Sequence, residues 1–410
     1  MMRAIADAKL QVGKRMVMIL VGSVFLLTSL GFSPVYGGQV RGVTEDLVKI
    51  GGIIDLTGPV AGQTKLWAEA WKSYFKDLNE QGGIQGRKIK LIIEDDRYSI
   101  PLGIAGFKKL IYRDEVYALL GPTSTGETKA LFDQIEKTKT PSFTASLAEE
   151  MTTPYRRYIF SLAPSYDDQV KVIFDYILGD LKAKDPRIGF IAADTEFGKE
   201  GLRAARKWAE HFGIKLADEE VLGHGDLDAT SQILGLKRAK TEYIIVHHGS
   251  EKVALCIRDA RKYAFSDVLF FATYYGCDEM VVQIAGNAAK NFYGVHSFNS
   301  WYDETPGMKK LVSVATKYNL PTKALIKMYI QGWVQAMILA EAIKRQGKNL
   351  TLDGFVDAME TIDKFDTGGI CGAITFTSKS HKGLRYLRIY TGDLEKERLK
   401  PVTDWRKPLE

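Results

Sequence analysis

Two pairs of neighbouring side chains in this sequence belong to the types that hold metals or move protons: His247-His248 and Asp95-Asp96. Imidazoles are common metal ligands, and paired carboxylates can act as general acid and base. The histidines are expected at the end of a strand, where adjacent side chains point to opposite faces, so they are poorly placed to bind one ion together. The aspartates have no evident acid–base partner. We therefore expect no metal site and no catalytic residue.

Other chemical motifs are also missing from the sequence. It contains no P-loop, no G-x-S-x-G nucleophile turn and no H-E-x-x-H zinc motif. The three cysteines, Cys256, Cys277 and Cys371, match no zinc-binding spacing, and their odd number leaves at least one thiol, or all three, unpaired. We predict a protein that is not an enzyme and that uses no cofactor.

A polar turn at residues 122–126 could bind an anion. Ser124 and Thr125 are expected between a strand and a helix, where unpaired backbone N–H groups and the helix dipole attract negative charge. The same two residue types are also common helix caps, so a purely structural role stays open.

Length and charge narrow the class of protein. The chain has 410 residues, which is typical of two domains. Its net charge is +6, and residues 1–37, with four basic residues and one acidic residue, account for three of these six charges. The remainder is too weakly and too evenly charged to predict nucleic-acid binding.

The N-terminal segment has the order of a secretory signal. Lys14 and Arg15 precede the apolar stretch Met16–Leu30, and small residues follow around Gly37. The stretch is short for a membrane span. We expect residues 1–37 to be a cleaved signal peptide, with a periplasmic or extracytoplasmic mature chain and no membrane span after cleavage; an uncleaved anchor is the alternative.

Apolar runs alternate with helical patterns along the rest of the chain, which predicts parallel sheets covered by helices. Strands are expected at residues 48–54, 88–96, 116–121, 188–192, 216–221, 243–247, 268–272, 292–296 and 386–390, with residues 158–160 as a short crossing segment. Helices are expected at residues 63–81, 101–113, about 126–137, 201–212, 252–262, 308–318 and 323–345, and from 352. The fold class is α/β with two lobes: residues 38–161 with 297–375, and residues 162–296 with 376–410.

The loops after the strands should line a cleft between the lobes, because ligands of such sheets bind at the carboxyl ends of the strands. These loops are residues 56–62, 95–99, 122–126, 143–147, 194–198, 247–250 and 273–278.

Several of these loops make the sequence similar to a known family. The stretches that carry the resemblance are IGGIIDLTGPVAG from Ile50, NEQGGIQGRKIKLIIEDD from Asn79, GPTST from Gly121, PSFTAS from Pro141, TEFGKEG from Thr195 and GAITFTSKSHKG from Gly372. Together they resemble the type I periplasmic binding proteins of the branched-chain amino-acid (LivJ-like) class, over about residues 48–390. The resemblance implies two Rossmann-like lobes joined by crossing hinge strands, a monomer, and delivery of a small-molecule ligand to the permease subunits of an ABC importer.

The resemblance also implies ligand contacts. The ligand's carboxylate would be held by Ser124, the backbone of Ala145 and Ser146, and Gln63 would touch the ligand's side chain. His296, Trp301 and Tyr302 follow a predicted strand and are weaker candidates for reaching the cleft.

Two departures from the family pattern bear on the ligand. Phe197 stands where the family usually has a tyrosine, and Tyr274 stands where amino-acid binders place a carboxylate for the ligand's ammonium. A buried ammonium without a partner is costly, although Asp278 or Asp303 could substitute. We therefore predict a carboxylate with an aromatic or apolar body, held among Tyr98, Phe197, Tyr274 and Tyr275, unless these aromatics are core residues. The alternative functions are a protein that binds branched-chain amino acids or amides, and a ligand-sensing module for a membrane receptor.

Overall fold

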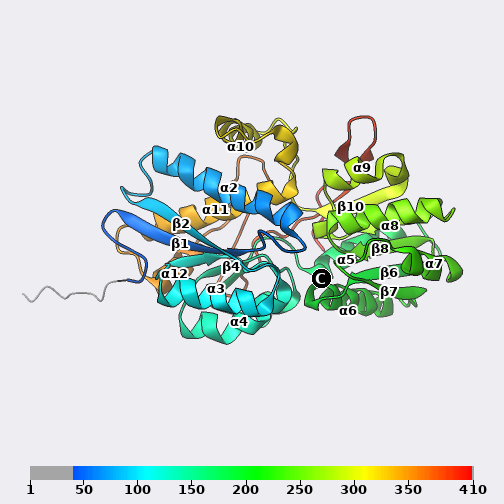
Figure 1. Ribbon diagram of the computed structural model, residues 1–410, viewed down its shortest axis with the longest axis horizontal. Coiled ribbons are helices and arrows are strands. Elements are labelled where there is room, and N and C mark those ends of the chain that lie inside the picture. The colour runs from blue at the N-terminus through cyan, green and yellow to red at the C-terminus, as the bar shows by residue number, and fades with distance from the viewer. Residues whose placement is uncertain (1–39, 409–410) are drawn as a thin grey trace, which may run out of the picture. The chain divides into compact units, whose positions relative to one another are not determined.

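The structure is a computed structural model that describes residues 40–408. The chain from Arg41 onward forms one compact unit built on two sheets (Figure 1). The predicted signal peptide, residues 1–37, lies outside the described residues. Among the residues that are described, no helix combines the length and the apolar character that a membrane crossing requires.

The first sheet is parallel throughout and contains five strands in the order β2-β1-β3-β4-β5. The strands are β1 (Leu47–Ile54), β2 (Lys88–Asp95), β3 (Ala118–Leu120), β4 (Ser142–Thr144) and β5 (Ile159–Ser161). Strand β4 was not predicted, and β5 takes the place of the predicted crossing segment at residues 158–160. Both strands are only three residues long, and each includes a polar residue, so neither forms the apolar run that marks a strand.

Helices α2 (Ala61–Glu80), α3 (Ile100–Tyr112) and α4 (Thr125–Lys137) connect the strands of the first sheet. They lie within a few residues of the predicted helices. Helix α2 runs on one side of this sheet, while α3 and α4 lie together on the other side (Figure 1).

The second sheet contains seven strands in the order β12-β11-β10-β9-β8-β6-β7. Strands β6 (Ile188–Ala193), β7 (Asp218–Leu222), β8 (Tyr243–His247), β9 (Leu269–Ala272) and β10 (Phe292–His296) are parallel. Strands β11 (Arg388–Asp393) and β12 (Arg398–Pro401) are antiparallel to their neighbours. The two C-terminal strands depart from the parallel arrangement of the rest of the sheet, and the four residues between β11 and β12 close a hairpin, which makes these two strands antiparallel.

The parallel strands of the second sheet alternate with helices, as the sequence predicts. These are α5 (Tyr166–Asp175), α6 (Glu196–His211), α7 (Thr230–Arg238), α8 (Ser250–Lys262) and α9 (Glu279–Ala285). Helix α6 is amphipathic: Ala204, Ala205 and Ala209 are buried, while Lys199 and Arg206 face solvent. The predicted fold class, α/β with two Rossmann-like sheets, is confirmed.

Three late helices follow β10: α10 (Pro306–Lys317), α11 (Lys327–Gln346) and α12 (Leu352–Glu360). Helix α11 lies beside α2 (Figure 1), and the indole N–H of Trp67 donates to Oε1 of Gln335 at 2.7 Å. The helices approach closely because Gly332 has no side chain; a Cβ there would lie 2.5 Å from the Trp67 ring.

The chain passes between the two sheets after β5, after β10 and before β11. Before the last passage it stays against β5, because the backbone of Gly383 donates to Ser161 at 2.9 Å and the ring of Phe376 packs against Phe160. The predicted lobe boundaries, after residues 161, 296 and 375, stay a prediction.

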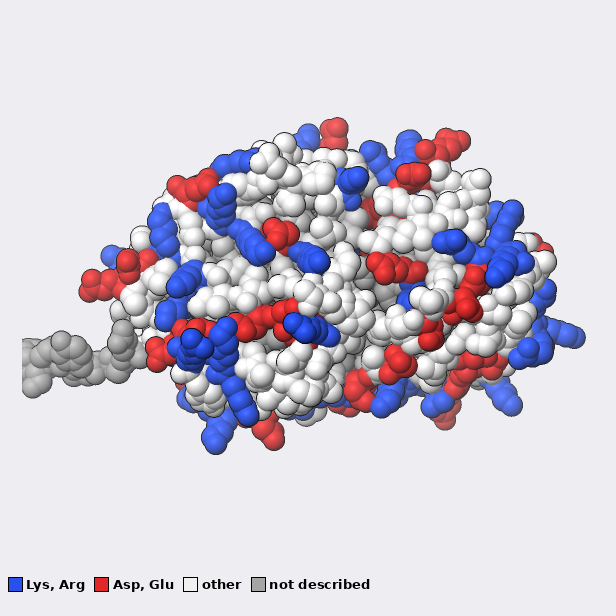
Figure 2. Space-filling model, in the orientation of Figure 1, with Lys and Arg blue, Asp and Glu red and all other residues white. Residues whose placement is uncertain are grey.

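Charged side chains of both signs are intermingled over the face drawn in Figure 2. This mixed surface agrees with the small net charge expected for the chain without its first 37 residues.

Candidate ligand-binding site

A cavity lies where the loops and helix starts of the two sheets meet. It encloses about 480 Å³ of space between protein atoms, open solvent at its mouth included. The lining residues belong to loops and helices beside both sheets, including helix α11. They are Val60, Gln63, Thr64, Trp67, Tyr98, Thr123, Thr125, Tyr166, Phe197, His224, Gly249, Tyr275 and Met328. Four of the eight predicted site residues are among them: Gln63, Tyr98, Phe197 and Tyr275.

The starts of six helices converge on this cavity. Thr125 and Tyr166 are the first residues of α4 and α5, Phe197 and Met328 are the second residues of α6 and α11, Gln63 is the third residue of α2, and Gly249 caps α8. Each helix N-terminus carries a partial positive charge and N–H groups without helical partners. The arrangement favours an anionic ligand group.

The loop after β3 holds the start of α4 in place. Ser124 forms a capping box with Glu127: the backbone N–H of Ser124 donates to Oε2 of Glu127 at 2.7 Å, and the N–H of Glu127 donates to Oγ of Ser124 at 3.1 Å. Ser124 therefore does not line the cavity, whereas Thr125 does. Among the described residues, the N–H groups of Thr125 and Gly126 have no acceptor.

The hydroxyl of Thr125 has two other hydroxyl groups beside it. Its Oγ1 lies 2.8 Å from Oγ of Ser146 and 3.5 Å from the hydroxyl of Tyr166. The Tyr166 hydroxyl also accepts the N–H of Leu147 at 3.1 Å. Ser146 is 1% exposed and stands behind Thr125 rather than in the cavity wall. Burial raises the pKa of Tyr166 to about 12, so its phenol is neutral and can donate.

Tyr275 occupies the space next to the predicted backbone contact at Ala145. Its hydroxyl, carried by the turn after β9, donates to the carbonyl oxygen of Ala145, which follows β4. The carbonyl of Ala145 is thus already engaged, and Ala145 does not line the cavity. Whether Ser124, Ala145 and Ser146 touch a ligand stays a prediction.

Aromatic rings form the body of the cavity wall. Phe197 stacks on His247 at a centroid distance of 3.8 Å, and Tyr166 meets the same imidazole edge-on at 4.8 Å. Tyr275 lies 6.0 Å from Phe197 and 6.4 Å from Trp67. Such a surface can bury an aromatic or apolar ligand body through offset and edge-to-face contacts.

The two adjacent histidines, His247 at the end of β8 and His248 directly after it, are held by hydrogen bonds to neighbouring loops. The ring of His247 reaches Oγ1 of Thr273 at 2.8 Å and the carbonyl of Phe197 at 3.0 Å, and burial lowers the pKa of His247 to about 3. Nδ1 of His248 accepts the N–H of Gly249 at 2.8 Å, and burial lowers its pKa as well. Both rings are neutral parts of the loop structure.

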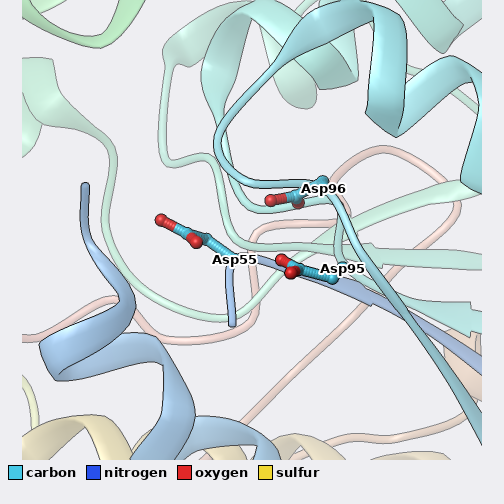
Figure 3. A group of neighbouring side chains, drawn as sticks. All are labelled: Asp55, Asp95 and Asp96. Atoms are coloured by element: carbon cyan, nitrogen blue, oxygen red, sulfur yellow. The ribbon is translucent and has the colours of Figure 1, made fainter. Parts of the chain in front are cut away.

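Asp55, Asp95 and Asp96 form a cluster of carboxylates at the ends of β1 and β2 (Figure 3). Each of them accepts hydrogen bonds from nearby loops. Asp55 accepts from the backbone of Val60 at 2.9 Å, Asp95 from Leu56 at 2.8 Å, and Asp96 from Tyr98 at 2.8 Å. The cluster therefore braces the loops that present Val60 and Tyr98 to the cavity.

One member of this cluster interacts with a second buried acid. Burial raises the pKa of Asp96 to about 6. Burial and the adjacent charge of Asp96 raise the pKa of Glu127 to about 8. At neutral pH Glu127 is therefore mostly protonated, and it stabilises the turn at Ser124 without adding a full negative charge behind the cavity.

Three predicted residues lie behind the cavity wall or away from it. Tyr274 is fully buried, and its hydroxyl donates to Oε1 of Gln331 at 3.0 Å. Asp278 accepts from Nε2 of Gln63 at 3.0 Å and caps α9. Asp303 accepts from the backbone N–H of Ser300 at 2.7 Å. The weaker candidates His296, Trp301 and Tyr302 are not lining residues either.

Sequence reasoning missed several lining residues, including His224, Trp67, Tyr166 and Met328. A signal existed for His224. Residues 216–221 were predicted as a strand, and the loop that follows, from Gly223, belonged among the loops at the same sheet edge. Trp67 and Met328 lie inside helical patterns, where the sequence does not distinguish a cavity wall from a core face.

The lining carries little charge. None of the lining residues, all of which belong to the described part of the chain, is an aspartate, glutamate, lysine or arginine. Among the lining residues, His224 is the one whose ordinary pKa lies closest to neutral pH. Burial lowers the pKa of His224, and the nearby carboxylate of Asp194 partly offsets this lowering. The cavity thus offers hydroxyls, N–H groups and aromatic faces.

Comparison with known proteins agrees with this architecture. A family model described as periplasmic binding protein matches residues 47–397. The leucine-, isoleucine-, valine-, threonine- and alanine-binding protein of Pseudomonas aeruginosa is 23% identical over 307 residues, which span 75% of this chain and 80% of that protein.

Two solved structures have the same fold. A branched chain amino acid ABC transporter protein from Thermus thermophilus with bound valine superposes with a TM-score of 0.83 at 25% identity, over 89% of this chain and 97% of that one. A fatty acid ABC transporter substrate-binding protein from Thermomonospora curvata gives a TM-score of 0.80 at 22% identity, over 90% of this chain and 94% of that one. The chain belongs to the periplasmic binding protein family.

Proposed function

We propose that this chain is an extracytoplasmic solute-binding protein. It binds a small organic carboxylate with an apolar or aromatic body between its two sheets and delivers it, as a monomer, to the permease subunits of an ABC importer. The solved relatives described as ABC transporter proteins support the transport role. The proposal includes no catalytic step and no cofactor.

We infer the class of ligand from the charge of the cavity wall. Six helix starts favour a negative group, and the wall has no carboxylate to pair with an ammonium. Burying an unpaired ammonium is costly, whereas a carboxylate at a helix N-terminus is stabilised by the N–H groups and the dipole. An acid without an amino group fits this wall better than a zwitterion does.

We place the ligand's carboxylate at the start of α4. The N–H groups of Thr125 and Gly126 and the hydroxyl of Thr125 would donate to it, while Ser124 and Ser146 hold the turn and the hydroxyl in position. The apolar body would then lie against Trp67 and Phe197, with Tyr98 and Tyr275 beside it.

A binding assay on the exported protein tests this function. The protein is stripped of ligand by unfolding and refolding, and benzoate, 3-phenylpropanoate and 4-methylpentanoate are titrated calorimetrically beside the amino acids. We expect at least one acid to bind at micromolar concentration and to raise the melting temperature. Binding of leucine or valine with no response to any acid would contradict the proposed ligand class. N-terminal sequencing of the same material should find a start near Gly38.

Branched-chain amino acids are a second candidate. The names of the Pseudomonas aeruginosa and Thermus thermophilus proteins favour it. In this chain a ligand ammonium would have to rely on the amide of Gln63 and on cation–π contact with Tyr275.

A further inference from the structure

Lys327 places a buried amino group directly behind the cavity wall. It is the first residue of α11 and is 2% exposed. Its neighbour Met328 lines the cavity. A lysine at this position is unfavourable on two grounds, since the N-terminus of a helix is already positive and burial removes the ammonium from water.

The turn after β9 supplies the contacts that compensate for this burial. Nζ of Lys327 donates to the carbonyl oxygen of Tyr274. It lies 4.4 Å from the centroid of the Tyr274 ring and 5.7 Å from that of Tyr275. Asp278 and Glu279 are buried near it, and their charges oppose the lowering of the lysine pKa by burial.

These contacts are the kind that recognise an ammonium. A carbonyl oxygen, two aromatic faces and nearby carboxylates together make a cation site. The site adjoins the cavity, because Tyr275 belongs to both and because Gln63, a lining residue, donates to Asp278 at 3.0 Å. Lys327 reaches into it from α11, beside the first sheet, while the turn belongs to the second sheet.

We propose that Lys327 is a specificity-determining residue: the chain fills this cation site with its own ammonium, and thereby favours carboxylates without an amino group over amino acids. The inference rests on the proposed solute-binding function. Lys327 repels a second ammonium in the cavity, and it occupies the aromatic faces and the carboxylates that would otherwise accept one.

Matched ligand pairs test the inference. 4-Methylpentanoate is leucine without its amino group, and 3-phenylpropanoate is phenylalanine without its amino group. Dissociation constants for both pairs are measured by calorimetry on the ligand-free, full mature protein and on Lys327→Gln, which keeps a donor for the Tyr274 carbonyl, and Lys327→Met, which does not. Lys323→Met, an exposed lysine in the preceding turn, is the control. Melting curves confirm that each variant is folded.

We expect the unmodified protein to bind each acid at least about tenfold more tightly than its amino acid, because like charges in a partly buried site repel by that much or more. The ratio of the amino acid's dissociation constant to that of its matching acid should fall by about tenfold in both Lys327 variants and stay unchanged in Lys323→Met. An unchanged ratio in a folded Lys327 variant overturns the inference.

If both Lys327 variants fail to fold, Asp278→Asn decides. This variant removes a negative charge near Lys327, so the preference for the acids should widen, and an unchanged ratio overturns the inference. If leucine binds tightly and 4-methylpentanoate does not bind, the protein is still a solute-binding protein, but the inference that Lys327 excludes amino acids is overturned. Failure of all four compounds to bind overturns the proposed ligand class, and the inference with it.

Discussion

The side-chain amide of Gln63 lies 3.0 Å from Oδ2 of Asp278 and 2.9 Å from Oγ of Ser250. Gln63 belongs to helix α2 beside the first sheet, whereas Ser250 and Asp278 follow strands β8 and β9 of the second sheet. One amide in the cavity wall therefore connects the two sheets, so a residue of the proposed binding site also holds the sheets in contact.

Replacing Gln63 by methionine should weaken ligand binding without unfolding the protein. The variant keeps the length of the side chain but removes the donor to Asp278. We expect the Gln63–Asp278 contact to form as the sheets close on the ligand, so that its loss, about 1.5–3 kcal/mol for a hydrogen bond to a charged group, lowers affinity. The dissociation constant of the best-binding acid should rise by roughly ten- to a hundredfold in calorimetry. Gln81→Met, an exposed position at the end of the same helix, is the control. Equal affinity in both variants would show that the Gln63 contacts do not contribute to binding.

Thr125 and Ser124 should respond differently to substitution. Thr125→Val removes the hydroxyl in the cavity wall and should lower affinity for the acid by about tenfold with little change in melting temperature. Ser124→Ala removes the cap of α4 and should reduce the free energy of unfolding by about 1 kcal/mol.

Ser124→Ala and Ser146→Ala should also weaken ligand binding, because the Ser124 side chain positions the start of α4 and the Ser146 side chain positions the hydroxyl of Thr125. Denaturant titration and calorimetry on the same samples separate the effects; full affinity in all three variants would place the carboxylate elsewhere.

Glu127 should make stability depend on pH in a defined direction. Its pKa is raised to about 8 in the folded protein by burial and by Asp96, against about 4.3 in an unfolded chain. Between these two values the folded state holds a proton that the unfolded state has lost. This group therefore lowers the free energy of unfolding, by up to about 1.4 kcal/mol per pH unit, as the pH rises toward 8.

Glu127→Gln removes this titration and keeps an acceptor for the N–H of Ser124. The variant should match the unmodified protein near pH 5 and exceed it in stability at pH 8. Denaturant melts at several pH values measure the difference. A difference that is the same at both pH values would mean that Glu127 is ionised throughout.

Ligand binding should bring the two sheets closer together. We expect closure about the crossing segments predicted near residues 160–163, 292–295 and 374–376. Small-angle scattering of the mature protein should show a smaller radius of gyration with saturating ligand than without it. Identical profiles, with binding confirmed by calorimetry, would contradict closure.

Much of the fold could be predicted from the sequence because its strands and helices carry strong local patterns. Strand β8 was predicted with its observed bounds, Tyr243–His247, since four of its five residues are apolar or aromatic and a Gly-Ser turn follows closely. The three-residue strands β4 and β5 carry no such pattern. Their pairing depends on neighbours that are distant in the sequence, as when Ser142 aligns with Leu119 and with Ile159.

The site was predicted at the level of loops and less well at the level of side chains. The sequence predicts that the turn at residues 122–126 binds an anion through Ser124, whereas in the structure it is Thr125 that lines the cavity. This difference depends on the capping box, in which the side chain of Ser124 turns back toward Glu127. Likewise, the sequence placed Tyr274 and Tyr275 together, and the structure separates them: Tyr275 lines the cavity and Tyr274 lies behind it.

The sequence by itself determined the class of protein, because the order and spacing of its motifs are local properties of the chain. Only the tertiary structure decided which side chains meet across the two sheets. Lys327 and Tyr274 are far apart in the sequence, and nothing in the residues around either one indicates a partner. Their contact exists because α11 packs beside α2 while the turn after β9 comes from the other sheet, which is a consequence of chain topology rather than of local pattern.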